Sequence, residues 1–317
     1  LGLIIVDEEH DQSYKQDDGV IYNARDMAIA RASFENIPIN LVTAVPSLET
    51  FKNIKTKKYN HVILENRFQN FPLPKSKIIN INIKKDKNFI SSESLKTVEK
   101  YLLNNDQILF FLNRRGYSNF LICKNCGYKH SCPNCSIYLT YHSFSSKVIC
   151  HYCDYTKKLD RKCLKNKNKC DFLKYGIGVE KVFEELKRLF PTKKIKIFSS
   201  DFLSRKKESN NLIKDIENNN IDILVGTQMI SKGFNFPKLN CIVVIDADFS
   251  GRGYDLRTTE KNIQLYNQLS GRAGRNSSKS LIIYQTVTPS NQTLINIIEN
   301  KFDRFLNDEL NLRKKNN

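Results

Sequence analysis

The chain has 317 residues and 40% hydrophobic content, enough to bury the cores of two ordinary domains. Lysine and arginine number 51 against 33 aspartate and glutamate, a net charge of +18, which favours a nucleic acid partner, with lysine- and asparagine-rich composition as the alternative explanation. No run reaches the roughly 18 apolar residues of a membrane span and no signal peptide is visible, and we expect a cytoplasmic protein without a membrane partner.

Apolar runs and helical patterns alternate along most of the chain. Residues 1–6 predict a strand buried on both faces of a parallel sheet. Further strands are expected at residues 37–42, 107–112, 194–198, 221–225, 241–245 and 280–285. Helices are expected at residues 26–34, 92–103, 179–189, 204–217 (with Ser204 as N-cap), 260–269 and 291–306. This alternation predicts an α/β fold whose parallel sheets carry helices on both faces.

Acidic residues follow the first strand directly, in the run Asp7-Glu8-Glu9-His10. The carboxyl end of a parallel strand is where open α/β sheets bind ligands. An aspartate there can hold Mg²⁺, and the adjacent glutamate can activate the water that attacks a γ-phosphate. A solvated turn is the alternative for an acidic pair at this position.

Two further runs carry phosphate-binding patterns. Gly226-Thr227 ends a predicted strand, and small residues there let a nucleic acid backbone or phosphate approach main-chain N–H groups. Arg272 and Arg275 are three residues apart and share a helix face, from which both could reach a γ-phosphate. Either pattern alone is also compatible with an ordinary turn or a solvated helix face.

Eight of the nine cysteines lie within residues 123–170, which is typical of metal binding in a reducing compartment. Three Cys-x-x-Cys pairs are intact: Cys123/Cys126, Cys132/Cys135 and Cys150/Cys153. The fourth is imperfect, because Cys163 is followed three residues later by Asn166 and the next cysteine is Cys170. Two such pairs supply the four thiolates of a tetrahedral zinc. The nearby His130, His142 and His151 are expected to be packing or surface residues.

Four runs together resemble motifs of the PriA family of superfamily-two DNA helicases. They are residues 4–16 with the Tyr22-Asn23-Ala24-Arg25-Asp26 run (motif II and an aromatic-rich loop), 43–50 (motif III), 226–237 (motif V) and 268–275 (motif VI). The resemblance implies an α/β fold with two RecA-like parallel-sheet helicase domains, the first incomplete, and a cysteine-rich zinc-binding insertion in the second. The implied boundaries are residues 1–90 for the first domain and a linker, 91–121 and 172–300 for the second domain, 122–171 for the insertion, and 301–317 for the start of a truncated C-terminal region.

The resemblance also implies a role for individual residues. The catalytic residues would be Asp7, Glu8, Arg272 and Arg275, and the nucleotide would also contact His10, Gly226 and Gln268. DNA would contact Tyr14, Lys15, Tyr22, Arg25, Thr227 and Lys232. One zinc would be held by Cys132, Cys135, Cys150 and Cys153, and a second by Cys123, Cys126, Cys163 and Cys170. Asn23 stands where the family usually has histidine, and Val45 replaces a hydroxyl residue of motif III, which weakens both motifs.

By this resemblance the protein is an ATP- and Mg²⁺-dependent 3′→5′ helicase that recognises stalled or recombinational forks and promotes primosome assembly. Its partners would be DNA, primosome proteins and single-stranded DNA-binding protein, in the cytoplasm at the nucleoid. The chain begins at Leu1 inside a predicted strand and contains no Gly-x-x-x-x-Gly-Lys phosphate loop, so we expect a fragment that does not hydrolyse ATP alone. The alternative is a non-enzymatic zinc module that binds forks or primosome partners. A transcription-type zinc ribbon would not explain residues 268–275.

Overall fold

The computed structural model divides the chain into two units. It describes residues 2–16, 18–64, 72–81, 89–113, 120–123, 130, 132–134, 139–142, 147–150, 153, 155–159, 172–175, 179–198, 206–228, 236–247, 257–274 and 279–315. Unit 1 comprises Leu1–Asn66, Glu260–Gln268 and Ile295–Asn317, and unit 2 comprises Arg67–Thr259 and Leu269–Leu294. Each unit is described separately below.

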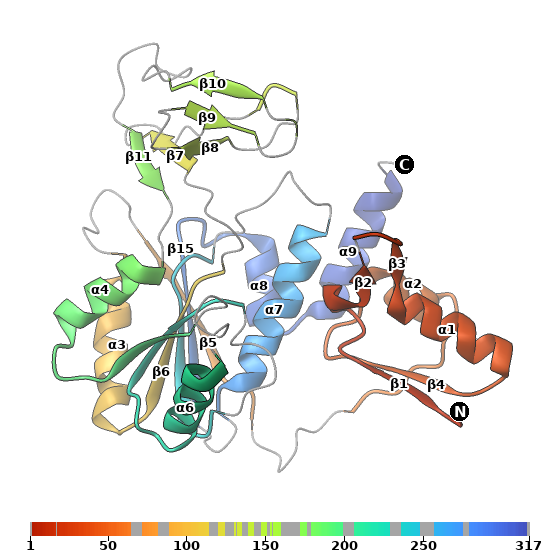
Figure 1. The fold of residues 1–317 in the computed structure, drawn as a ribbon, viewed down its shortest axis with the longest axis horizontal. Coiled ribbons are helices and arrows are strands. Elements are labelled where there is room, and N and C mark those ends of the chain that lie inside the picture. The colour runs from red at the N-terminus through yellow and green to blue at the C-terminus, as the bar shows by residue number, and fades with distance from the viewer. Residues whose placement is uncertain are drawn as a thin grey trace. The chain divides into compact units, whose positions relative to one another are not determined.

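Unit 2 contains a six-stranded sheet in the order β12-β13-β6-β14-β15-β5 (Figure 1). Its strands are β5 (Lys75–Asn80), β6 (Gln107–Phe111), β12 (Ile195–Phe198), β13 (Ile223–Gly226), β14 (Leu239–Val244) and β15 (Leu281–Thr286). All of its pairings are parallel. The central strands β6 and β14 are buried at every position, as expected for strands covered on both faces. The predicted α/β class is confirmed.

Helices cover both faces of this sheet. They include α3 (Ser92–Leu103), α4 (Val179–Leu189) and α6 (Lys206–Glu217). Val98 of α3 and Val182 of α4 pack in one core with Phe110 and Val243 of the central strands. The connection from β6 to β12 through α4 and the return to β13 through α6 run in opposite directions along the sheet. Right-handed crossovers therefore place α4 and α6 on opposite faces, as Figure 1 shows.

The segment before residue 90 belongs to this sheet, which differs from the expected domain plan. Strand β5 pairs with β15 along its whole length. The backbone N–H groups of Phe89 and Ser91 donate to Glu185 and Gln285 of unit 2 at 3.1 and 2.9 Å. The sequence of β5 predicted a linker because it is lysine-rich. An edge strand tolerates lysine, since one of its sides stays in solvent. Only its pairing with β15 reveals where it belongs.

A small β-rich insertion lies between β6 and α4 in the chain. Strand β7 (Phe120–Cys123) pairs with β11 (Phe172–Tyr175) in antiparallel fashion. Strands β8 (Thr140–His142), β9 (Lys147–Ile149) and β10 (Thr156–Lys158) form a second antiparallel sheet. Five buried residues of this part form one hydrophobic cluster: Leu121, Cys132, Leu139, Val148 and Cys150. Two cysteines are therefore part of the insertion's small core.

Unit 1 is built around a parallel strand pair. Its elements are β1 (Ile4–Asp7), the 3-10 turn η1 (Gln12–Tyr14), β2 (Lys15–Gln16), β3 (Tyr22–Asn23), α1 (Ala24–Glu35), β4 (Ile39–Val42), α2 (Leu48–Lys55), most of α7 (Thr258–Arg272), most of α8 (Gln292–Ile298) and α9 (Phe302–Lys315). Strand β1 pairs with β4, and β2 pairs with β3 in a short hairpin. Helix α9 packs against α2.

The expectation that the first strand is buried on both faces was wrong. Val6 is 5% exposed, but Ile5 is 62% exposed. Within the described residues β1 pairs only with β4, and α1 contacts both strands. A strand covered on one face buries only alternate side chains, which gives the observed pattern.

The predicted helix at residues 291–306 is two helices, α8 and α9, separated at Asn300. Asn300 has φ 53°, and the N–H groups of Lys301 and Asn300 donate to the carbonyls of Asn296 and Ile297 at 2.8 and 3.1 Å. This is the Schellman arrangement that ends many helices. The second of these helices continues beyond the predicted end at residue 306, to Lys315.

The same ending recurs at Asn36, Asn105 and Asn219, which have φ values of 51°, 61° and 58°. In each case the next N–H group donates to a carbonyl five residues back. Asparagine tolerates this left-handed conformation better than other residues with a Cβ. The asparagine-rich composition of the chain therefore does not fully account for these residues, because each of them ends a helix.

Replacing Asn105 with alanine is expected to lower the free energy of unfolding of unit 2 by about 1 kcal/mol, while glycine at this position is neutral or slightly stabilising. Amide hydrogen exchange across α3 would measure the change. Asn104, which precedes the turn with φ −83°, offers the matched control. An equal effect of alanine at Asn104 would contradict the assignment.

None of the helices in the part of the chain that the structure describes is long and apolar enough to cross a membrane.

Candidate functional site

The acidic run lies at the carboxyl end of β1, and its second residue has a strained backbone. Glu8 has φ 48°, a region that residues with a Cβ rarely adopt and that is often found at functional sites. Its N–H group donates to Asp7 Oδ1 at 2.9 Å. The Asp7 side chain is exposed, whereas Glu8 is partly buried. The turn therefore presents the first carboxylate to solvent and bends the second away from the strand direction.

Tyr14 holds the same turn from the other side. Its hydroxyl donates to the Asp7 carbonyl oxygen at 2.6 Å. Burial raises the pKa of Tyr14, and the negative charges of Asp7, Asp11 and Glu8 raise it further, so the hydroxyl keeps its proton. Tyr14 was predicted as a DNA contact, and the structure places its hydroxyl on the backbone of the acidic turn.

Glu9 points into the core, where four hydrogen bonds reach its carboxylate. Glu9 is 1% exposed. Its Oε2 accepts from Arg25 Nη1 at 2.9 Å, from the Ser47 hydroxyl at 3.0 Å and from the Thr50 hydroxyl at 3.0 Å. Its Oε1 accepts from the Ser47 N–H group at 2.7 Å. One carboxylate thus connects the end of β1 with the first turns of α1 and α2.

Arg25 is the buried cation of this group rather than an exposed arginine. It is 7% exposed, and its Nε and Nη2 atoms both lie 2.8 Å from Asp26 Oδ1. Burial acts to lower the pKa of Arg25, but the hydrogen bonds to Asp26 and Glu9 outweigh it and raise the pKa. The guanidinium donates to these two carboxylates and to the Ser47 hydroxyl, and its predicted contact with DNA stays a prediction.

His10 connects three predicted motifs through a chain of hydrogen bonds. Its Nδ1 lies 2.7 Å from Thr43 Oγ1, and its Nε2 lies 3.2 Å from Gln268 Nε2 of α7. The Thr43 hydroxyl donates to the Val45 carbonyl at 2.9 Å, so its oxygen accepts the hydrogen of Nδ1. The unprotonated Nε2 of the ring then accepts from the Gln268 amide. This assigns the Nδ1–H tautomer to His10.

We expect nitrogen-15 NMR to report His10 with a protonated Nδ1 and an unprotonated Nε2. Thr43→Val removes the hydroxyl that accepts from Nδ1–H, and loss of this hydrogen bond costs about 1 kcal/mol, while Thr43→Ser retains the hydroxyl. The valine variant should shift the ring toward the Nε2–H tautomer, and the serine variant should not. A ring protonated at Nε2 in the unaltered chain would refute the assignment.

The hairpin that precedes α1 exposes several apolar side chains. Val20, Ile21 and Tyr22 are 79%, 73% and 47% exposed, and Lys15 on the paired strand is also exposed. Gly19, at the tip, has φ 70°, which glycine adopts without strain. An exposed aromatic and apolar tip beside a cation can stack on bases and pair with phosphate.

The other predicted contacts that can be placed lie in unit 2. Gly226 ends β13 in the core, and Thr227 follows it, partly buried. The next residue, Gln228, donates to Asn113 Oδ1 at 3.0 Å, so the ends of β13 and β6 meet at one edge of the sheet. Arg272 is the last residue of α7. Lys232, Arg275 and Ser204 lie outside the described residues.

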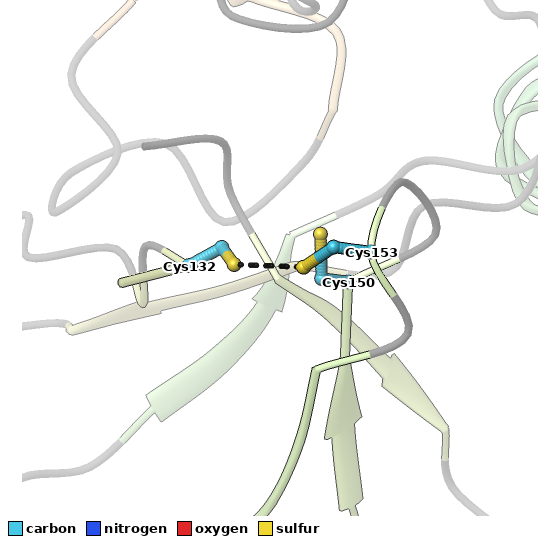
Figure 2. A group of neighbouring side chains, drawn as sticks. All are labelled: Cys132, Cys150 and Cys153. Carbon is cyan, nitrogen blue, oxygen red and sulfur yellow. Dashed lines mark hydrogen bonds between the residues drawn. The ribbon is translucent and has the colours of Figure 1, made fainter. Parts of the chain in front are cut away.

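Three of the cysteines predicted for the inner zinc site lie together (Figure 2). The Sγ atoms of Cys132, Cys150 and Cys153 are all within 4.8 Å of one another. Sulfur atoms about 2.3 Å from a tetrahedral zinc lie about 3.8 Å apart, and the Sγ atoms of Cys132 and Cys153 are 3.5 Å apart. The donor set therefore fits a metal ion of this kind.

The remaining predicted ligands are only partly described. Cys135, the fourth inner ligand, lies outside the described residues, as do Cys126, Cys163 and Cys170. Cys123 is buried at the end of β7, opposite Phe172 of β11. His130 is 8% exposed and stacks on Phe172 at 4.9 Å between ring centroids, in agreement with its expected packing role.

Glu9 and Ser47 were not among the predicted site residues, although their hydrogen bonds join the end of β1 to the starts of α1 and α2. Ser47 was recognisable as an N-cap because serine before a helix commonly caps it, and its hydroxyl does accept from Thr50 N–H at 3.3 Å. Nothing in the acidic run distinguishes a buried glutamate from its exposed neighbours. Its identification needed the tertiary contacts.

Comparison with known proteins gives consistent matches. The family described as helicase conserved C-terminal domain matches residues 134–277. The replication restart protein PriA of Rickettsia conorii is 42% identical over 99% of this chain and 49% of its own length. That of Bacillus subtilis is 33% identical over 99% of this chain and 39% of its own length. The structure of RecG bound to a three-way DNA junction aligns with 98% of this chain and 30% of that chain, at a TM-score of 0.46 and 13% identity.

The parallel sheet of unit 2 and the match of residues 134–277 make this part of the chain similar to the conserved C-terminal domain of helicases. Over nearly its whole length the chain is similar to replication restart proteins PriA, at 33–42% identity. The chain spans about half the length of the curated relatives it matches.

Proposed function

We propose that the protein to which this chain belongs is an ATP-dependent 3′→5′ DNA helicase that recognises stalled or recombinational forks and promotes primosome assembly. The observation that carries this proposal is the hydrogen-bond chain from Gln268 through His10 to Thr43, because it links motifs VI, II and III. Such a link allows the acidic turn to respond to the position of α7. Primosome proteins and single-stranded DNA-binding protein would be its partners, at the bacterial nucleoid.

In this proposal the acidic turn carries out the chemistry of ATP hydrolysis. Asp7, exposed at the end of β1, would hold Mg²⁺ and Glu8 would act as the base on the attacking water. Arg272 and Arg275 would stabilise the charge on the transferred phosphate, and Gly226 would contact the nucleotide. On the complete gene product, Glu8→Gln should abolish DNA-stimulated ATP hydrolysis, whereas Glu35→Gln on the surface of α1 should not.

Single-stranded DNA would bind the exposed hairpin tip, with Lys15 and Thr227 contacting the backbone and Lys232 adding a further cation. Tyr22→Ala is expected to weaken binding of a fluorescent oligonucleotide by about tenfold, since stacking contributes about 1–3 kcal/mol per base. Phe34→Ala is the control, because Phe34 is also an exposed aromatic residue and lies at the other end of α1. Equal affinity of both variants would remove the hairpin from the proposed DNA site.

Zinc would hold the insertion in two sites, the inner one with Cys132, Cys135, Cys150 and Cys153. The outer site would use Cys123, Cys126 and Cys163. Its fourth ligand would be Cys170, because Asn166 stands where the Cys-x-x-Cys spacing would place a cysteine. A bound zinc supplies structural cross-linking in such sites. Cys170→Ser should then lower the zinc content from about two toward one per chain, whereas about one zinc in both proteins would mean that the outer site does not form.

A non-enzymatic zinc module that binds forks or primosome partners remains the second candidate, favoured by the separate core of the insertion. ATP hydrolysis by the complete gene product separates the two functions. Turnover that depends on Glu8 supports the helicase, and fork binding without turnover supports the module.

A further inference from the structure

One face of α7 contacts the segment that leads into α2. Glu260, Gln264 and Gln268 are each four residues apart in this helix, and that spacing places side chains on one face. Glu260 Oε1 accepts from the Leu48 N–H group at 2.9 Å, and Gln264 Nε2 donates to the Pro46 carbonyl at 3.4 Å. Three successive turns of α7 therefore contact residues 46, 48 and His10 of the same unit.

The first of these contacts is at the start of α2, where backbone N–H groups have no partner within the helix. Ser47 caps α2, and its own N–H group donates to the Glu9 carboxylate. The N–H group of Leu48, the next residue, donates to the Glu260 carboxylate. Two carboxylates from different parts of the chain thus approach the positive end of α2, where negative charge is favourable.

Glu260 is itself fixed by a second contact. It is 3% exposed, and its Oε2 lies 3.5 Å from Arg313 Nη2 of α9. Arg313 also pairs with Glu309 at 3.1 Å on the same helix. Gln264 is 5% exposed. Both side chains are therefore held in place, which is what alignment of a neighbouring segment requires.

We infer that Glu260 and Gln264 are positioning residues: they hold residues 46–48 through the backbone so that His10 stays in register with Gln268. Glu260 and Gln264 bind main-chain atoms of this segment, and those atoms do not depend on which side chains the segment carries. Loss of the Glu260 contact lets residues 43–48 move relative to α7, and Thr43, the acceptor of His10 Nδ1, moves with them. The consequence for ATP turnover rests on the proposed function, whereas the structural coupling does not.

The test is made on this chain by amide hydrogen exchange and by nitrogen-15 NMR of His10. Glu260→Ala should speed exchange at Leu48 by about tenfold or more, because the lost hydrogen bond opens the first turn of α2. The same variant should mix the two tautomers of His10, which lies 250 positions away in sequence. Glu260→Gln, which keeps an acceptor oxygen for Leu48, should restore both signals.

Glu309→Gln is the matched control, since it removes a carboxylate from the same Arg313 without contacting Leu48. Gln264→Leu is the second variant if Glu260→Ala does not fold. It should loosen residues 46–48 and disturb His10 in the same way. Unchanged exchange at Leu48, or a His10 ring that keeps its tautomer while Leu48 exchanges faster, would overturn the inference. Neither result depends on whether the complete protein hydrolyses ATP, so the inference and the proposed function can fail separately.

Discussion

Replacing Arg25 with methionine is expected to destabilise the start of α1 and α2 by about 3–5 kcal/mol, because it leaves a buried carboxylate without its cation. Glu9 is 1% exposed and would keep only the Ser47 and Thr50 donors. Their hydrogen bonds do not replace a full positive charge in a site of low dielectric constant. The loss should therefore greatly exceed that of an ordinary surface substitution.

Amide hydrogen exchange of peptides covering residues 24–35 and 48–55 measures this loss locally. It is preferable to one unfolding curve, because a chain with two units need not unfold in a single step. Arg31→Met is the matched control on the same helix: Arg31 pairs with Glu35 at the surface, and its side chain is 60% exposed. Its removal should cost about 0.5 kcal/mol or less.

The double variant Glu9→Gln with Arg25→Met separates charge from packing. Removing both charges together should recover much of the stability lost with Arg25 alone, because no uncompensated charge remains. If Arg25→Met costs no more than Arg31→Met, the buried pair does not organise this region. In that case the predicted contact with DNA would be the favoured role of Arg25.

Removing the proposed zinc is expected to unfold the insertion while the six-stranded sheet stays folded. Structural zinc contributes on the order of 10 kcal/mol to small domains, and the described core of the insertion contains only a few residues, two of them cysteines. Chelation should expose residues 120–175 to proteolysis. The central strands β6 and β14, buried at every position, should remain protected from hydrogen exchange.

Cys153→Ser should lower the zinc content by one per chain, measured by elemental mass spectrometry. Cys153 is the exposed member of the cluster, so its replacement tests ligation with little change to packing. Cys241→Ala is the control, because Cys241 is buried in β14, away from the predicted pairs in sequence. Burial, with a smaller contribution from Asp106, raises the pKa of Cys241 to about 12, so it should also resist alkylation. An unchanged zinc content in Cys153→Ser would rule out the inner site.

Most elements could be predicted from periodicity and end signals. The bounds of α3 and α4 agree with the expected helices, because each has strong helical spacing. The break at Asn300 was missed because apolar residues continue across it, and the left-handed turn depends on one backbone conformation. Strand β5 was taken for linker because its sequence is lysine-rich, while its place in the sheet depends on pairing with β15, about 200 residues away.

The sequence by itself determined the α/β class, the cysteine pairs and the motif strings, because these depend on local spacing and residue type. Only the tertiary structure decided which side chains meet. It placed Glu9 and Arg25 together in the core, aligned His10 with Gln268, and set Glu260 at the start of α2. Contacts between residues far apart in the chain depend on how elements pack, and the spacing of residues along one strand or helix carries no record of that packing.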